Sequence, residues 1–110
     1  MEQMKFTKKQ YEKINKAFRD LNIDSGSRDI GIFKFASESK RHRMAKFKLC
    51  EEYWEEGKPF LCEATANNGK QRFDFVDLLK GEVIEIDVTN RPKREKIPTR
   101  RINPLAERDY

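Results

Sequence analysis

The spacing of apolar residues predicts two helices in the first half of the chain. Apolar side chains recur every three or four positions over residues 7–21, which is the spacing of one buried helix face. Thr7 and Gln10 have the spacing of a capping box at its start. A second helix is predicted over residues 40–56, which ends at a glycine because glycine readily adopts the left-handed conformation of a helix C-terminus. Between them, residues 30–36 form either a short strand or an extended lead-in to the second helix.

Three short strands are predicted after the helices. Their ranges are Phe60–Ala66, Gln71–Leu79 and Glu82–Val88. The dipeptide Asn68-Gly69 is a strong hairpin signal between the first two strands, and Lys80-Gly81 is a weaker one between the second and third. With 110 residues, the chain is expected to fold as one compact α/β domain, residues 1–110, that contains a three-stranded antiparallel meander.

If each dipeptide forms a two-residue turn, the pairing of the three strands follows directly. Glu63 is then opposite Asp74 on the second strand. On the third strand, Asp87 lies opposite Asp74, and Glu85 lies opposite Val76. Opposed residues point to the same face of a sheet, so the acidic side chains form a row on one face. The other face collects apolar side chains, namely Phe60, Cys62, Ala64, Phe73, Phe75, Ile84, Ile86 and Val88.

A second register is open at the second turn. A glycine bulge there would shift the third strand by one residue and place Asp77, instead of Asp74, beside Glu85 and Asp87. In either register several carboxylates share one patch, and like charges directly opposite each other destabilise a sheet. A hard cation such as Mg²⁺, Mn²⁺ or Ca²⁺, which prefers oxygen ligands, would neutralise them. The alternative is a solvated acidic face with Arg72 and lysines interspersed.

Two cationic residues, His42 and Lys46, fall on the apolar side of the second helix. They are four residues apart and are therefore neighbours on the helix surface. Lys46 either lays its aliphatic stem along the rim of the sheet or directs its ammonium group to the carboxylates. His42 is either a structural residue or a candidate base.

The charge of the chain favours a polyanionic partner. It has 24 Lys and Arg residues against 19 Asp and Glu, a formal net charge of +5, and such an excess attracts nucleic acid without reading its sequence. The candidate phosphate contacts are Arg41, Arg43, Arg72, Arg91, Lys93, Arg94, Lys96, Arg100 and Arg101. Residues 91–110, which hold most of them, are expected to form a short helix or strand and then a loose basic tail, with a merely solvated tail as the alternative.

The sequence gives no indication of export or of a membrane span. No apolar run has the length of a span, and the first residues do not form a signal peptide, so a cytoplasmic location without a membrane partner is expected. Cys50 and Cys62 do not form a CxxC motif. They are expected to be buried thiols in a reducing compartment, with a disulfide as the alternative.

The segment from Ser37 to Asp87 resembles the PD-(D/E)xK nuclease superfamily. It is most similar to the small Holliday-junction-resolvase-like and competence-associated nuclease-like members, whose core is a helix followed by a three-stranded antiparallel meander. The residues that carry the resemblance are Glu38, His42, Lys46, Gly57, Glu63, Arg72, Asp74, Glu85 and Asp87. Glu38 and Glu63 match accessory acidic positions. The resemblance implies a restriction-endonuclease-like core over residues 37–88, with an extra N-terminal helix before it and a short C-terminal extension after it.

The resemblance also implies roles for individual residues. Asp74 and Glu85 match the two acidic residues that bind metal in the motif. Asp87 stands where the motif has its lysine, and Lys46 is a candidate to supply the missing ammonium group. The implied metal ligands are Glu63, Asp74, Glu85 and Asp87. The implied catalytic residues are Asp74, Glu85, Asp87, Lys46 and His42.

The activity that the resemblance implies is hydrolysis of phosphodiester bonds by an endonuclease that uses Mg²⁺ or Mn²⁺. Its expected substrate is DNA rather than RNA, in particular branched or structured DNA, and a homodimer is expected if both strands are cut. Because Asp87 replaces the motif lysine, a catalytically inactive nucleic-acid-binding relative is one alternative. A small interaction protein without a nucleic-acid role is another.

Overall fold

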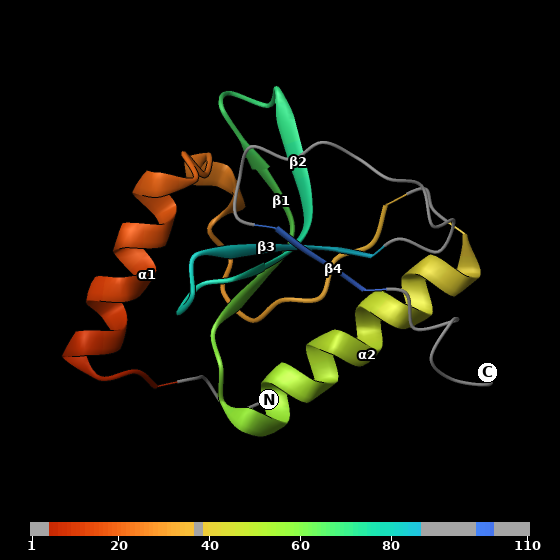
Figure 1. Cartoon of the computed structure of the whole chain (residues 1–110), viewed down its shortest axis with the longest axis horizontal. Coiled ribbons are helices and arrows are strands. Elements are labelled where there is room, and N and C mark those ends of the chain that lie inside the picture. Colours follow the sequence, from red (N-terminus) through yellow and green to blue (C-terminus); the bar gives the residue numbers. More distant parts are fainter. Residues whose placement is uncertain (1–4, 37–38, 87–98, 103–110) are drawn as a thin grey trace.

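Two α-helices and a four-stranded sheet make up the part of the chain that the computed structural model describes, residues 5–36, 39–86 and 99–102 (Figure 1). The helices are α1 (Lys8–Asp20), the 3₁₀-helix η1 (Ser25–Ser27) and α2 (Lys40–Glu56). The strands are β1 (Phe60–Ala66), β2 (Gln71–Asp77), β3 (Glu82–Ile86) and β4 (Thr99–Ile102). The sheet order is β1-β2-β3-β4, antiparallel among the first three strands and parallel between β3 and β4. The expected α/β class and the antiparallel meander are thus confirmed.

α1 begins at the capping box that its sequence predicts. The Thr7 hydroxyl accepts a hydrogen bond from the Gln10 backbone N–H at 3.1 Å, and the Gln10 side chain accepts one from the Thr7 N–H at 2.8 Å. These bonds satisfy backbone donors that the first turn of a helix leaves without an intrahelical partner. α2 begins in a similar way, because the Ser39 hydroxyl accepts from the His42 N–H at 3.2 Å. It ends at Gly57, whose φ of 66° is left-handed.

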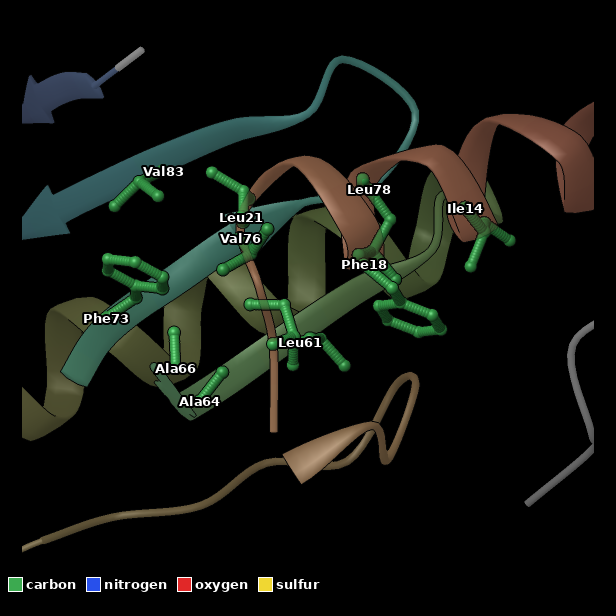
Figure 2. Packing of buried hydrophobic residues seen from close by; sticks show 12 residues of the cluster. Ile14, Phe18, Leu21, Leu61, Ala64, Ala66, Phe73, Val76, Leu78 and Val83 are labelled. Carbon is green, nitrogen blue, oxygen red and sulfur yellow. The ribbon is translucent and has the colours of Figure 1, made fainter. Parts of the chain in front are cut away.

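One hydrophobic core, the α1 core, lies between α1 and one face of the sheet (Figure 2). Its residues from α1 and the segment after it are Ile14, Ala17, Phe18, Leu21 and Ile23. Its residues from the strands and the β2–β3 turn are Leu61, Ala64, Ala66, Phe73, Val76, Leu78 and Val83. All of them are buried, and the removal of this apolar surface from water is the main stabilisation on this side.

A second hydrophobic core, the α2 core, lies between α2 and the opposite face of the sheet. Its residues are Leu49, Cys50, Tyr53, Phe60, Cys62, Phe75 and Ile84. Figure 1 shows the two helices on opposite sides of the strands. The prediction of one apolar face and one acidic face is therefore wrong, because helices cover both faces and both carry apolar side chains.

The first hairpin has the predicted turn and register. The Lys70 N–H donates to the Asn67 carbonyl at 3.3 Å, and the two central residues, Asn68 and Gly69, have φ angles of 57° and 80°. Positive φ at both central positions is the mark of the type I′ turn that Asn-Gly favours. The Asp24 carboxylate accepts hydrogen bonds from the N–H groups of both central residues, each at 2.8 Å, and so holds the turn against the loop after α1.

The second hairpin has a longer turn than the sequence suggests. Asp77 pairs with Glu82, so four residues, 78–81, connect the strands instead of two. The Asp77 carboxylate is buried, accepts from the N–H groups of Leu79 and Lys80 at 3.1 Å each, and also accepts from the Tyr53 hydroxyl at 2.7 Å. These bonds end β2 at Asp77, two residues earlier than expected.

Because of the longer turn, the register between β2 and β3 differs from the predicted one by two residues. Val76 pairs with Val83 instead of Glu85, and the last recorded pair is Phe75 with Ile84. Asp74 therefore comes level with Glu85 and not with Asp87. The alternative register with a glycine bulge, which would have placed Asp77 beside Glu85, is also wrong because Asp77 pairs with Glu82.

The segments outside the meander show one short strand and one extended segment. Residues 30–36 belong to no strand and form the extended lead-in to α2, anchored where the Gly31 N–H donates to the Phe60 carbonyl at 2.9 Å. β4 lies within the basic extension, for which a short helix or strand was expected. Asp87 and Val88, assigned to the third strand from the sequence, lie outside the described residues.

Candidate functional site

β1 and β2 change face at the same level of the sheet. Cys62 pairs with Phe75, and both pack in the α2 core. Two residues further along each strand, Ala64 pairs with Phe73, yet these two pack in the α1 core. In a regular strand, residues two apart share a face. The alternation is therefore interrupted at the residue between each of these pairs.

Glu63 and Asp74 are the two residues at this change of face, and the recorded ladder between β1 and β2 skips them. Glu63 has a φ of 55°, a left-handed conformation that costs a residue with a side chain about 1–3 kcal/mol. Both side chains meet residues of α2. Backbone strain of this kind clusters at functional sites, which makes this position the candidate site.

Lys46 reaches Glu63 from α2 and is fully buried. Its Nζ lies 3.7 Å from Glu63 Oε2, with the lysine side chain 0% and the glutamate side chain 8% exposed. Of the two placements that the sequence leaves open for Lys46, the structure has the one in which the ammonium group faces a carboxylate. On the solvent side, Arg72 Nε lies 3.8 Å from Glu63 Oε1. Taking two charges out of water costs free energy even when they pair. The presence of this ion pair is therefore not explained by a gain in the stability of the fold.

His42 and Asp74 form a second polar contact one helical turn away. His42 Nε2 lies 3.6 Å from Asp74 Oδ2, and the two side chains are 22% and 20% exposed. The same Asp74 oxygen accepts a hydrogen bond from the Ile86 N–H at 3.1 Å. The Asp74 side chain thereby satisfies a backbone N–H of β3 that lies two residues beyond Ile84, where the pairing of β2 with β3 ends. His42 Nε2 is buried and has no hydrogen-bond partner among the described residues.

The predicted metal ligands are only partly brought together. Glu63 and Asp74 meet neighbouring residues of α2, and Glu85 is half-buried next to Ile84 in β3. Within the described residues, no group of three or more His, Cys, Asp or Glu side chains is arranged to hold a metal ion. The carboxylates are nevertheless hard oxygen donors, and Mg²⁺ in proteins needs only one or two of them because it keeps several waters. Asp87 and Glu38, also singled out from the sequence, lie outside the described residues.

The predicted phosphate contacts that lie among the described residues fall into three groups. Arg41 is exposed at the start of α2, and Arg43 is half-buried, with its guanidinium carbon 5.8 Å from the Phe35 ring centre. Arg72 is largely exposed on β2 beside Glu63. The backbone positions of Arg100 and Arg101 are in β4, next to β3. The remaining four lie outside the described residues, namely Arg91, Lys93, Arg94 and Lys96.

Cys50 of α2 and Cys62 of β1 are free, buried thiols that lie next to each other in the α2 core. A hydrogen bond with Cys62 and burial raise the pKa of the Cys50 thiol, whereas the hydrogen bond from Cys50 lowers the pKa of Cys62. Cys62 also donates to the Lys34 carbonyl at 3.0 Å. The expectation of buried thiols is confirmed.

Sequence reasoning missed an aromatic surface beside the site. Phe33, Phe35 and Phe47 lie together, and two of them are among the most exposed large apolar side chains described. The signal in the sequence is the alternation of aromatic residues at Phe33 and Phe35.

Compared with family models, with curated proteins and with solved structures, the chain gives no significant match. Among the described helices, none is both long enough and apolar enough to cross a membrane.

Proposed function

We propose that this protein is a divalent-metal-dependent nuclease that hydrolyses phosphodiester bonds in DNA, with its active site between α2 and the change of face in β1 and β2. The observation that carries this proposal is the convergence of charged residues there. Lys46 and His42 on α2 meet Glu63 and Asp74 on the strands at 3.7 and 3.6 Å. Burial of charge and a strained backbone are both unfavourable for stability, and their occurrence together is typical of functional sites.

The metal would be held by water molecules and by carboxylates of the three antiparallel strands, namely Glu63 of β1, Asp74 of β2 and Glu85 of β3. When bound, it would stabilise charge on the phosphoryl oxygens and lower the pKa of a water molecule. The substrate would be held at its phosphates by Arg41, Arg43 and Arg72. The net charge of +5 favours the same polyanionic substrate.

Two residues of α2 supply the groups that act on the phosphodiester. The ammonium group of Lys46 is fixed beside Glu63 in a place with little access to solvent, where an electrostatic interaction is stronger than in water. Its positive charge acts on the phosphoryl group through space, without contact, and so takes the role left vacant by Asp87 at the motif lysine position. Asp74, which lies 3.6 Å from His42 Nε2, orients the imidazole ring, and the other ring nitrogen, Nδ1, donates a proton to the leaving oxygen.

Cleavage assays on plasmid, branched and single-stranded DNA with Mg²⁺ or Mn²⁺ test this function. Asp74→Ala and Glu85→Ala are each expected to abolish cleavage while the circular dichroism spectrum stays that of the wild type. Glu55→Ala is the matched control, since it removes an exposed carboxylate of α2. Full activity in either site variant, or no cleavage of any of these substrates by the wild type, would overturn the proposal.

A second candidate is a nucleic-acid-binding protein that does not cleave. It is favoured by the pairing of both carboxylates with cations of the chain, since Glu63 has Lys46 and Arg72 nearby and Asp74 has His42. Calorimetry with Mn²⁺ separates the two. The nuclease binds the ion with measurable heat that Asp74→Ala removes, whereas the binding protein gives no such heat and still binds DNA in EDTA.

A further inference from the structure

A shallow pocket of about 530 Å³ lies along α2 next to the candidate site. Its main lining residues are Phe33, Phe35, Arg43, Met44, Phe47 and Lys48. Phe35, Met44 and Phe47 are 67%, 53% and 42% exposed. Apolar side chains of this size are normally buried, and a cluster of them around a pocket marks a binding surface.

The rings form a continuous aromatic surface from two segments of the chain. The centre of the Phe33 ring lies 6.0 Å from that of Phe35 and 5.1 Å from that of Phe47, with tilted planes in both pairs. The ring of Phe47 in turn lies 5.9 Å from Trp54. Such rings offer faces at several orientations, and every nucleic-acid base can stack on an aromatic face once it is unpaired.

The charges around the pocket suit a polyanion. Arg43 and Lys48 line it, with the Arg43 guanidinium carbon 5.8 Å from the Phe35 ring centre. Among the described residues that line it, Glu51 is the one acidic residue. Lys40 and Arg41 are exposed at the start of α2, whose first turn contains no acidic residue. Together with the net charge of +5, this arrangement favours a phosphate backbone over a neutral apolar segment.

The pocket is also continuous with the candidate site. Lys46 Nζ lies 5.8 Å from the centre of the Phe33 ring and 3.7 Å from Glu63 Oε2. Phe33 therefore belongs to the aromatic surface and at the same time covers the buried ammonium group. A strand whose bases stack on this surface has its backbone beside the ion pairs of α2.

We infer that this aromatic pocket binds a single-stranded stretch of nucleic acid by stacking its unpaired bases on Phe35 and Phe47, with Arg43 and Lys48 at its phosphates. The inference rests on the proposed function for the cleavage step, and it specifies the substrate class. The substrate is then DNA with an unpaired segment, such as a single strand, a flap or an open junction, and not a continuous duplex.

Fluorescence anisotropy with the full chain in EDTA tests the binding step separately from cleavage. The probes are a labelled oligothymidylate of about 15 nucleotides and a blunt duplex of the same length. Phe35→Ala and Phe47→Ala are each expected to weaken single-strand binding by about tenfold or more, as the loss of one stacked base does. Duplex binding should change less than about twofold in either variant.

Tyr11→Ala is the matched control, because Tyr11 is a 48% exposed aromatic residue on α1. It should leave single-strand binding unchanged. All variants should keep the melting temperature of the wild type within a few degrees, since the replaced rings are partly exposed. Unchanged single-strand affinity in Phe35→Ala and Phe47→Ala would overturn the inference.

Two further variants separate stacking from apolar docking. Phe35→Trp should retain the affinity for oligothymidylate, and Phe35→Leu should lose it, because only the first offers an aromatic face. If Phe35→Leu binds like the wild type, or if Phe35→Ala changes only the sedimentation of the free protein, the pocket holds an apolar partner or a second copy and the inference is wrong. Loss of binding in Phe35→Ala without any cleavage by the wild type would overturn the proposed nuclease function alone.

Discussion

On the α1 side of the sheet, Ile14 and Phe18 pack into a cluster made entirely of apolar residues. The α2 side adds to its apolar cluster the buried Lys46–Glu63 ion pair and the half-buried contact between His42 and Asp74. The α1 core follows the ordinary rule that burial of apolar surface stabilises a domain. The Lys46–Glu63 ion pair does not follow this rule, because replacing a buried ion pair by apolar residues of similar volume is often neutral or stabilising. The comparison indicates that the α1 side serves stability, while one end of the α2 side holds charges that stability does not require.

The largest expected loss of stability comes from the α1 core. Phe18→Ala removes a ring that is 8% exposed, and the transfer and cavity effects should lower the free energy of unfolding by about 3–5 kcal/mol. Urea denaturation measures it. Tyr11→Ala, on the exposed side of the same helix, is the control and should cost less than about 0.5 kcal/mol. A loss below about 1 kcal/mol in Phe18→Ala would show that α1 does not carry the core.

The Lys46–Glu63 pair should respond differently to one substitution and to two. Lys46→Met removes the ammonium group that lies 3.7 Å from the Glu63 carboxylate, which is 8% exposed, and should cost about 3 kcal/mol. Lys46→Met combined with Glu63→Gln should cost about 2 kcal/mol less than the sum of the single losses. Urea denaturation of the four proteins gives this coupling energy. Simple additivity would contradict the role of the pair in burying charge.

A smaller effect isolates the backbone strain at Glu63. The left-handed φ of 55° disfavours any residue with a Cβ, and glycine adopts it freely. Glu63→Gly should therefore be about 1 kcal/mol more stable than Glu63→Ala, since both lack the carboxylate. In an ordinary strand the order is reversed. Finding Ala more stable than Gly would contradict the left-handed conformation.

The sequence predicted those parts of the fold that depend on local signals. The capping box at Thr7 and Gln10 and the type I′ turn at Asn68-Gly69 form as expected because short side chains and glycine determine them within a few residues. The turn between β2 and β3 is longer than predicted, because its first residue has the apolar character of a strand residue. Leu78 is 0% exposed and belongs to the α1 core, so it resembles a strand residue, although the Asp77 carboxylate already caps the turn.

The candidate site was predicted only in part, and for a physical reason. Lys46 and His42 stand out on an otherwise apolar helix side, and their pairing with carboxylates follows from the need to compensate buried charge. The change of face at Glu63 could not be predicted. A left-handed glutamate has no local sequence signal, and strict alternation along β1 and β2 led to the prediction of one acidic and one apolar face.

Metal-dependent cleavage of a labelled single-stranded oligonucleotide by Asp74→Asn tests the active-site assignment most directly. The asparagine keeps the size of the side chain and an oxygen for the Ile86 N–H, but it removes the charge that faces His42. With Mn²⁺ present, the wild type should cleave, and Asp74→Asn should keep its melting temperature while its cleavage rate falls by at least about a hundredfold. Cleavage by Asp74→Asn at the rate of the wild type would contradict an active site on the α2 side of the sheet.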